Sequence, residues 1–318
     1  MTVPGEIVYF EGRFVPQAEA RVPITTHAFN YGTGCFEGIR AYWSPRQERL
    51  NVVRLREHAE RLLRSAHILH LEPPTELTVE RVGEVVVELL ARNGYREDVY
   101  VRPILYKSGA TIKVTLSGIS SNLCIYTLPF GDYLDIRSGL RVMISAWRRI
   151  DDNSIPSRAK PTGAYLNAAL ASDEARARGF DEAIMLTQDG HVSEASSSNL
   201  FLVEQGVLVT PQAQDDVLVG ITRDCVLALA RERGLEVEVR RVDRSELLSA
   251  DEAFLAGTGV QIAPVTEVDG RTIGGGALGP VTREVQDAYL SVVRGETDSW
   301  QEWLTPVGAP ETAEAGRA

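Results

Sequence analysis

A break in the strand pattern near the middle of the chain most constrains its fold. The run Pro129-Phe130-Gly131-Asp132-Tyr133 separates an apolar strand-like segment at 123–128 from another at 140–145. Proline and glycine interrupt strands, and a chain of 318 residues usually divides into about two domains. We therefore predict a small α+β N-terminal domain at 1–129, an interdomain loop at 130–138 and a larger domain at 139–304. Residues 305–318 are rich in Pro, Ala, Gly and Glu, which predicts a disordered tail.

The first domain is expected to combine strands with two helices. Short segments at 7–10 and 13–15, reversed at Glu11-Gly12, predict a hairpin. Apolar residues recur at helical spacing over 54–71 and 77–90, and strand patterns return at 99–106 and 123–128. The intervening stretch 26–42 mixes three glycines with aromatic residues, which is typical of a pocket wall or of a packed turn.

The larger domain is also expected to combine strands with helices. Residues 165–178 predict a helix ended by Gly179, and residues 182–209 predict a strand meander turned at Asp189-Gly190 and Gln205-Gly206. Helices at 222–233 and 281–294 and a strand at 237–242 follow. The predicted fold class is therefore α+β.

Lysine is scarce, which narrows any chemistry that needs a free amine. It occurs only at Lys107, Lys113 and Lys160, and arginine supplies the rest of the 33 basic residues. Arginine cannot replace it, because a guanidinium group stays protonated. Lys160 has small and apolar neighbours, and desolvation favours the neutral amine that attacks a carbonyl. On this stretch alone, a Schiff-base lysine and an ordinary solvated loop lysine both remain open.

Three further segments supply groups that complement such a lysine. Glu194 leaves a predicted strand among small polar residues. Gly220-Ile221-Thr222 opens a helix whose free N–H groups and hydroxyl suit a phosphate, and Gly257-Thr258-Gly259 offers a second anion cradle. A lysine, a carboxylate and two anion cradles together predict pyridoxal 5′-phosphate as the cofactor.

Composition argues against several other functions. The net charge of −11 and the pI near 5.1 disfavour nucleic acid and anionic membrane surfaces as partners. No apolar run is long enough to cross a bilayer, so small-molecule partners are expected. Three cysteines without metal spacing and an N-terminus without a secretory signal predict a cytoplasmic protein.

Two rival enzyme classes lack their motifs. His67 and His70 lie three apart without further ligands in a recognisable set, so no metal site is predicted. The serines at 196–198 lack the Gly-x-Ser-x-Gly elbow of a serine hydrolase.

Taken in order, these segments resemble the branched-chain amino acid aminotransferases among the fold-type IV pyridoxal phosphate enzymes. The resemblance extends from Tyr31-Gly32-Thr33-Gly34 to Pro280-Val281-Thr282. It implies a larger C-terminal domain built on a pseudo-barrel of strands, with the cofactor in the cleft between the two domains. It also implies a homodimer, or a hexamer built from dimers, in which a loop of one subunit reaches the other subunit's cleft.

The activity implied is amino-group transfer between branched-chain L-amino acids (Leu, Ile, Val) and 2-oxoglutarate by a ping-pong mechanism. Lys160 would form the Schiff base and carry protons, Glu194 would pair with the pyridine nitrogen, and Tyr165 would bond the phenolic oxygen. The residues that would hold the phosphate are Arg61, Ile221, Thr222 and Thr258. Singly, each has a structural alternative, such as a solvated helix arginine for Arg61 or an N-cap for Thr222.

The resemblance also implies substrate-binding residues. The apolar wall would comprise Tyr31, Phe36, Phe130 and Tyr133. The backbone at Thr258-Gly259 would take the α-carboxylate, and Arg102 the distal carboxylate of glutamate or 2-oxoglutarate. Arg40 is a nearby second guanidinium, for which a substrate role and a structural ion pair are equally open.

Two departures from the family pattern leave the substrate range open. Thr258-Gly259 stands where the family often has Thr-Ala, and the loop at 107–118 does not resemble the hydrophobic loop of the best-studied bacterial type. The alternative is therefore a transaminase of the same fold acting on (R)-primary amines or D-amino acids, or a lyase. Arg102 is followed by Pro103-Ile104, so the Arg-x-His pattern resembling D-amino acid enzymes is missing.

Overall fold

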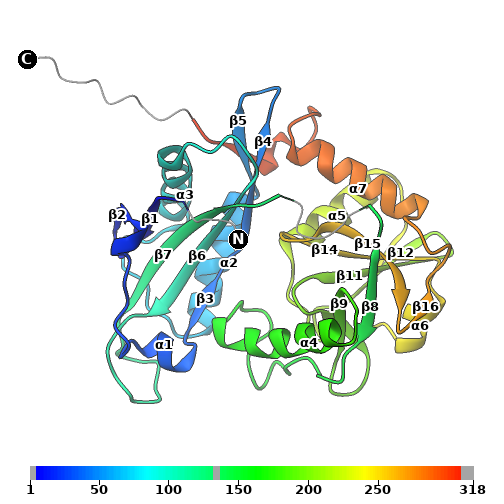
Figure 1. Ribbon diagram of the computed structural model, residues 1–318, viewed down its shortest axis with the longest axis horizontal. Coiled ribbons are helices and arrows are strands. Elements are labelled where there is room, and N and C mark those ends of the chain that lie inside the picture. The colour runs from blue at the N-terminus through cyan, green and yellow to red at the C-terminus, as the bar shows by residue number, and fades with distance from the viewer. Residues whose placement is uncertain (1–4, 132–136, 309–318) are drawn as a thin grey trace, which may run out of the picture.

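The protein, as a computed structural model that describes residues 5–131 and 137–308, forms two sheets lying side by side (Figure 1). The strands of the first sheet are β1 (Ile7–Phe10), β2 (Arg13–Pro16), β3 (Gly34–Phe36), β4 (Ile39–Ser44), β5 (Arg49–Val53), β6 (Val99–Lys107), β7 (Ser121–Pro129) and β17 (Leu304–Pro306). Their order is β17-β5-β4-β6-β7-β1-β2, and β3 pairs with β6 outside this path.

Helices α2 (Leu55–Ile68) and α3 (Val79–Asn93) pack on one face of the first sheet. Side chains on its other face line a cavity, which is described below. This domain also contains α1 (His27–Tyr31) and a short 3-10 turn η1 (Gln17–Glu19). The Thr78 side chain caps α3, and Gly94 ends it in the left-handed conformation with φ 63°. Leu62 on α2 and Val86 on α3 are fully buried against the sheet, as their helical spacing predicts.

The second sheet is larger and curled. Its strands are β8 (Leu140–Ile144), β9 (Glu182–Leu186), β10 (Val192–Ala195), β11 (Asn199–Glu204), β12 (Val207–Pro211), β13 (Val237–Arg240), β14 (Glu252–Gly257), β15 (Gln261–Val268) and β16 (Arg271–Thr272). The order is β10-β9-β8-β15-β14-β11-β12-β13, and β16 pairs with β15. Although β10 lies at one end of this order, it also contacts β11 and β12. The sheet therefore curls back on itself, and the predicted α+β class with a pseudo-barrel of strands is confirmed.

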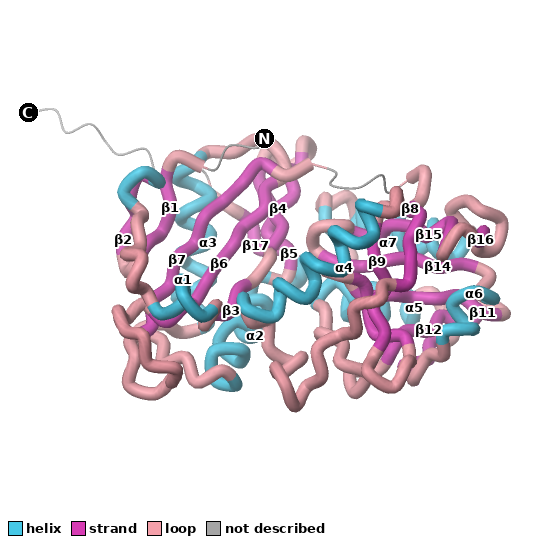
Figure 2. The backbone as a smooth tube through the Cα atoms, turned by 60° about the horizontal axis from the view of Figure 1, so that its bottom comes forward, coloured by secondary structure: helices cyan, strands magenta, loops and turns pink. Residues whose placement is uncertain are grey.

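The helices of the second domain are α4 (Tyr165–Ala177), α5 (Ile221–Glu232), α6 (Arg244–Ser249) and α7 (Pro280–Val293), with 3-10 turns η2 (Thr162–Ala164) and η3 (Gln301–Trp303). Helices α5 and α7 pack on β14, and α4 packs on β9. Figure 2 shows α4 running between the two lobes, close to the end of α1. Among the described residues, no helix is both long and apolar enough to cross a membrane.

The structure corrects two expectations and adds two hairpins. The disordered tail from residue 305 is wrong for residues 305–308, because β17 pairs antiparallel with β5 and Val307 is buried. The strands at 182–209 form two hairpins, β9 with β10 and β11 with β12, which are not neighbours along the sheet order as a meander would require. The hairpin of β4 with β5 and that of β14 with β15 were not predicted.

Candidate active site

Two adjoining cavities open between the sheets. The first is lined mainly by the second domain, with Arg61 from α2. The second is larger and is lined by residues of β6 and β7 together with the β14–β15 turn. Five residues belong to the walls of both cavities: Arg61, Lys160, Tyr165, Ser197 and Thr258. Lys160 therefore lies where the two spaces meet.

The segment that carries Lys160 is attached to the first domain by its backbone. The N–H of Phe36 donates to the carbonyl of Lys160 over 3.1 Å, and the N–H of Lys160 donates to the Ser65 hydroxyl over 3.2 Å. Gly32 has a φ of 64°, and a Cβ there would lie 2.9 Å from Cα of Gly163. Gly32 and Gly163 thus allow their two chain segments to approach closely, which fixes the position of the backbone that carries Lys160.

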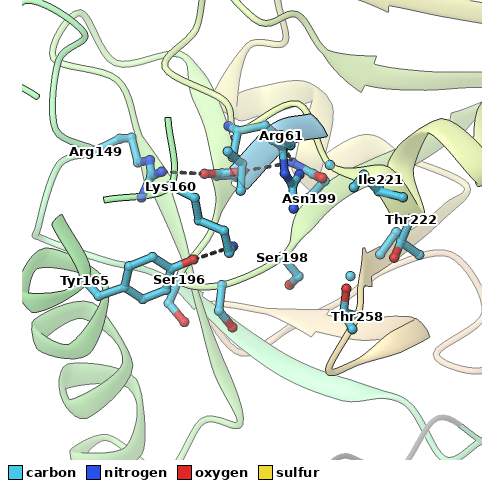
Figure 3. A pocket seen from close by; sticks show the side chains of 16 residues that line it. Arg61, Arg149, Lys160, Tyr165, Ser196, Ser198, Asn199, Ile221, Thr222 and Thr258 are labelled. Atoms are coloured by element: carbon cyan, nitrogen blue, oxygen red, sulfur yellow. Dashed lines mark hydrogen bonds and ion pairs between the residues drawn. The ribbon is translucent and has the colours of Figure 1, made fainter. Parts of the chain in front are cut away.

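The Lys160 amine projects into the cavity beside two aromatic rings. Its Nζ donates to the Tyr165 hydroxyl over 2.6 Å and lies 5.1 Å from the centre of the Phe36 ring. The rings of Phe36 and Tyr165 meet edge to face at 4.6 Å. Figure 3 shows Lys160 between Tyr165 on one side and Ile221, Thr222 and Thr258 on the other.

Glu194 lines the first cavity and is held on both of its carboxylate oxygens. Arg149 pairs with Oε1 at 2.7 Å, and Asn199 donates to Oε2 over 2.8 Å. Burial raises the pKa of Glu194, and the charge of Arg149 opposes that rise. The carboxylate is thus fixed in one orientation facing the cavity that Lys160 enters.

One end of the first cavity is built to receive an anion. Helix α5 begins at Ile221, so the N–H groups of its first turn have no acceptor within the helix. Thr222, Thr258 and the guanidinium of Arg61 line the same end. The Ser198 hydroxyl in this wall is buried and has no hydrogen-bond partner among the described residues. Positive helix-end charge, a guanidinium and three hydroxyls fit a phosphate group.

The second cavity has a mixed apolar and cationic wall. Tyr100 and Arg102 share one face of β6, and their register partners on β7 are Leu128 and Tyr126. Arg102 donates to the Tyr100 hydroxyl over 2.8 Å, and its guanidinium lies 4.3 Å from the Phe36 ring centre. Its Nε is buried with no hydrogen-bond partner within the described part of the chain. The guanidinium therefore has donor capacity left for a carboxylate.

The structure gathers most of the predicted site residues. All seven predicted cofactor residues line the first cavity: Arg61, Lys160, Tyr165, Glu194, Ile221, Thr222 and Thr258. Arg102, Phe130, Thr258 and Gly259 line the second, and Phe36 packs between Lys160 and Arg102. Tyr133 lies outside the described residues.

Besides Phe36, which packs behind the walls, two predicted substrate residues line neither cavity. Tyr31 is 41% exposed on the outer side of α1, where its hydroxyl donates to the Ile112 carbonyl over 2.8 Å. The Arg40 guanidinium is buried and donates to the carbonyls of Gly131 and Gly259 over 2.8 and 3.4 Å. Arg40 therefore joins Gly131 to the β14–β15 turn and lies 3.9 Å from Asp98, contacts that favour the structural ion pair among its two predicted roles.

Several wall residues were missed by sequence reasoning. They are Gly38, Tyr100, Tyr126, Leu128, Arg149, Asn199 and Val260. The period of two along a strand would have placed Tyr100 beside Arg102, and Asn199 stood in the stretch already singled out around Glu194. Arg149 carries no local signal, because its partner is set only by the tertiary fold.

Comparison with known proteins agrees with this geometry. Residues 34–268 match the model of the amino-transferase class IV family. A probable branched-chain-amino-acid aminotransferase of Aquifex aeolicus is 45% identical over 303 residues, which cover 95% of this chain and 97% of that protein.

Two solved structures share the whole fold. A branched-chain aminotransferase from Thermoproteus uzoniensis with norvaline has a TM-score of 0.91 at 43% identity and covers 96% of this chain and 100% of its own. The branched-chain amino acid aminotransferase from Thermobaculum terrenum in its PLP-form also has a TM-score of 0.91, at 38% identity, with 96% and 99% covered. The protein described here therefore belongs to the class IV aminotransferases.

Proposed function

We propose that this protein transfers amino groups between the branched-chain L-amino acids Leu, Ile and Val and 2-oxoglutarate, with pyridoxal 5′-phosphate as its cofactor. The observation that carries the proposal is the position of Lys160 in the wall shared by an anion-binding cavity and a larger apolar and cationic cavity. The named relatives from Aquifex aeolicus and Thermoproteus uzoniensis support the same substrate class.

The residues of the first cavity fit the cofactor from end to end. The α5 N-terminus, Thr258 and Arg61 would hold the phosphate. The buried Ser198 hydroxyl, which has no partner in the described part of the chain, lies in the same wall. Glu194 would pair with the pyridine nitrogen, and Tyr165 with the phenolic oxygen. When bound, the cofactor supplies an electron sink that stabilises negative charge at the substrate Cα.

Lys160 is the proposed catalytic base. Its Nζ is positioned by the Tyr165 hydroxyl at 2.6 Å, and a neutral amine at this point can take the proton from the substrate Cα. Arg149 and Asn199 keep the Glu194 carboxylate facing the ring nitrogen position. Phe36 and Tyr165 place apolar ring surface beside the amine.

The second cavity suits both substrates of a ping-pong cycle. Leu128, Phe130 and Val260 offer apolar surface for a branched aliphatic side chain. Arg102, whose buried Nε finds no partner among the residues that the structure describes, would receive the distal carboxylate of 2-oxoglutarate. The backbone of Thr258-Gly259, in the wall of the same cavity, would take the α-carboxylate.

The catalytic test uses the purified protein loaded with pyridoxal 5′-phosphate. L-leucine should convert the visible absorption band of the bound cofactor, and 2-oxoglutarate should restore it. Lys160→Ala should abolish both the band and turnover, and a variant that transaminates at the normal rate would refute the assignment. D-leucine and an (R)-amine in the same panel measure the alternative activities; conversion with these alone would replace the proposed substrate class.

A homodimer, or a hexamer built from dimers, is the proposed assembly. Exposed apolar side chains gather on α1, on the loop it holds and on α4: Phe29, Ile112, Val114 and Leu166 are 68%, 83%, 85% and 70% exposed. His27 and Tyr31 on α1 bond to the carbonyls of Lys113 and Ile112, so α1 and this loop form one surface. A second copy covering it would bring Tyr31 to the partner's cleft, where its proposed substrate role could operate.

Light scattering tests the assembly. The double variant Ile112→Glu, Val114→Glu should shift the protein toward monomers, whereas the control Val239→Glu, on a residue 44% exposed on β13, should not. A wild-type monomer at micromolar concentration would contradict the proposal.

A cytoplasmic location is also proposed, and the free thiols of Cys35, Cys124 and Cys225 support it. Expression of a tagged chain with fractionation of the cells checks that location.

A further inference from the structure

A buried charged cluster at Arg61 includes two residues, Glu37 and His58, to which the proposed reaction gives no role. Glu37 lies in the turn between β3 and β4, and His58 and Arg61 face it from α2; the three side chains are 0%, 3% and 5% exposed. Burial of ionisable groups is unfavourable unless each finds a partner. Three buried ionisable groups in contact therefore indicate that this arrangement has a specific role.

Glu37 fixes the plane of the Arg61 guanidinium. Arg61 donates from Nε to one Glu37 oxygen over 2.7 Å and from one terminal nitrogen to the other over 2.8 Å. Its second terminal nitrogen donates to the Val219 carbonyl over 2.9 Å. Of the five N–H groups of arginine, two remain without an acceptor among the described residues, and Arg61 lines both cavities.

The Val219 contact ties this guanidinium to the anion cradle. Val219 directly precedes Gly220, the N-cap of α5, whose first-turn N–H groups line the cavity. One planar group thus spans from a carboxylate of the first domain to the helix N-terminus of the second. The two remaining N–H groups of Arg61 are therefore held at a fixed position relative to the first-turn N–H groups of α5.

His58 holds the carboxylate in turn. Its Nδ1 lies 2.7 Å from Oε2 of Glu37, the oxygen that also accepts from Arg61. Burial lowers the pKa of His58, so the imidazole is neutral and Nδ1–H donates to the carboxylate. With both oxygens occupied, Glu37 has no freedom to rotate away from Arg61.

We propose that Glu37 and His58 are positioning residues for the cofactor phosphate, acting through Arg61 by fixing the direction of its two free N–H groups. The inference rests on the proposed cofactor. Charge alone predicts the opposite effect, because the Glu37 carboxylate beside Arg61 should weaken phosphate binding. Removal of the Glu37 charge would then tighten binding, whereas loss of orientation loosens it, so the sign of the effect decides between them.

The experiment compares pyridoxal 5′-phosphate with pyridoxal, which lacks the phosphate, in titrations of the cofactor-free full-length protein followed by absorbance and fluorescence. Glu37→Gln should weaken pyridoxal 5′-phosphate by about tenfold or more and leave pyridoxal within about twofold, as expected for a lost charge-assisted bond. Glu60→Gln is the matched control, because Glu60 adjoins Arg61 on α2 but is 46% exposed and pairs with Arg56. It should change neither affinity.

His58 supplies a second, milder pair of variants in case Glu37→Gln fails to fold. His58→Leu removes the donor and should give a smaller loss restricted to pyridoxal 5′-phosphate, and His58→Asn should restore it because its amide N–H replaces Nδ1–H. Tighter binding in Glu37→Gln, or equal losses for both ligands, would overturn the inference. A wild-type protein that binds neither ligand would refute the cofactor assignment and this inference with it, whereas normal selectivity in all variants refutes this inference alone.

Discussion

The Nζ atom of Lys160 lies 2.6 Å from the Tyr165 hydroxyl oxygen, five residues along the same segment. The intervening 3-10 turn η2 and the start of α4 turn the chain so that both side chains face one cavity. The proposed base is thus held by a neighbour that its own local structure supplies. The strength of this bond sets how well the amine is aimed at the substrate Cα.

Tyr165→Phe should lower kcat by about tenfold to a hundredfold, the effect of losing a hydrogen bond to a charged or reacting group. The ring contact with Phe36 at 4.6 Å is retained, so the fold should be unchanged. Steady-state kinetics with L-leucine and the visible spectrum of the bound cofactor measure the effect. Tyr126→Phe, which alters the second cavity without touching Lys160, serves as the control; equal losses in both variants would contradict a specific role for Tyr165.

Arg102→Leu should weaken 2-oxoglutarate by at least about tenfold, because a charge-assisted bond to the distal carboxylate is lost. The oxo acid of leucine, 4-methyl-2-oxopentanoate, has no distal carboxylate and should be affected far less. KM and kcat/KM for both oxo acids give the comparison. Tyr100→Phe removes the hydroxyl that accepts from Arg102 over 2.8 Å and should show the same preference more weakly. Equal losses for the two oxo acids would mean that Arg102 is structural.

Arg40→Met should act differently, because Arg40 joins the interdomain loop at Gly131 to the turn at Gly259. Asp98, which lies 3.9 Å from Arg40, keeps Arg294 as a partner at 3.1 Å, so the substitution leaves no unpaired carboxylate. We expect a loss of about 1–3 kcal/mol in the free energy of unfolding and a similar rise in KM for leucine and 2-oxoglutarate. Urea denaturation and kinetics check both. A loss confined to 2-oxoglutarate would instead make Arg40 a substrate ligand.

The stability of the cofactor-free protein should depend on Glu37 at acid pH. Burial alone would raise the pKa of Glu37, but the charge of Arg61 and the bonds from Arg61 and His58 hold it well below its ordinary value of 4.5. A lowered folded-state pKa stabilises the fold fully above the ordinary value, and this stabilisation is lost as the pH falls below it. Between pH 6 and pH 3, wild type should lose at least about 1 kcal/mol more than Glu37→Gln. Urea denaturation of both proteins at each pH measures these losses. Equal losses of stability in wild type and Glu37→Gln would contradict the prediction.

Local patterns predicted the parts of this molecule that depend on neighbouring residues. Helical spacing located α2 and α3, and the ordered motifs at Lys160, Glu194 and Thr222 located the wall of the first cavity. What escaped prediction depends on distant pairing. Arg149 gains its partner only when the loop before Lys160 meets β10, and β17 is a strand only because β5 offers it an edge. No residue near either position carries that information.

The pairing of β17 with β5 has a consequence for the newly made chain. Strand β5 is synthesised early, yet its antiparallel partner, beginning at Leu304, leaves the ribosome only after every strand of the second sheet. Until then the first sheet keeps an open edge next to β5, and an unpaired edge can recruit strands from other chains. The N-terminal domain is therefore finished last, after the domain that follows it in the sequence.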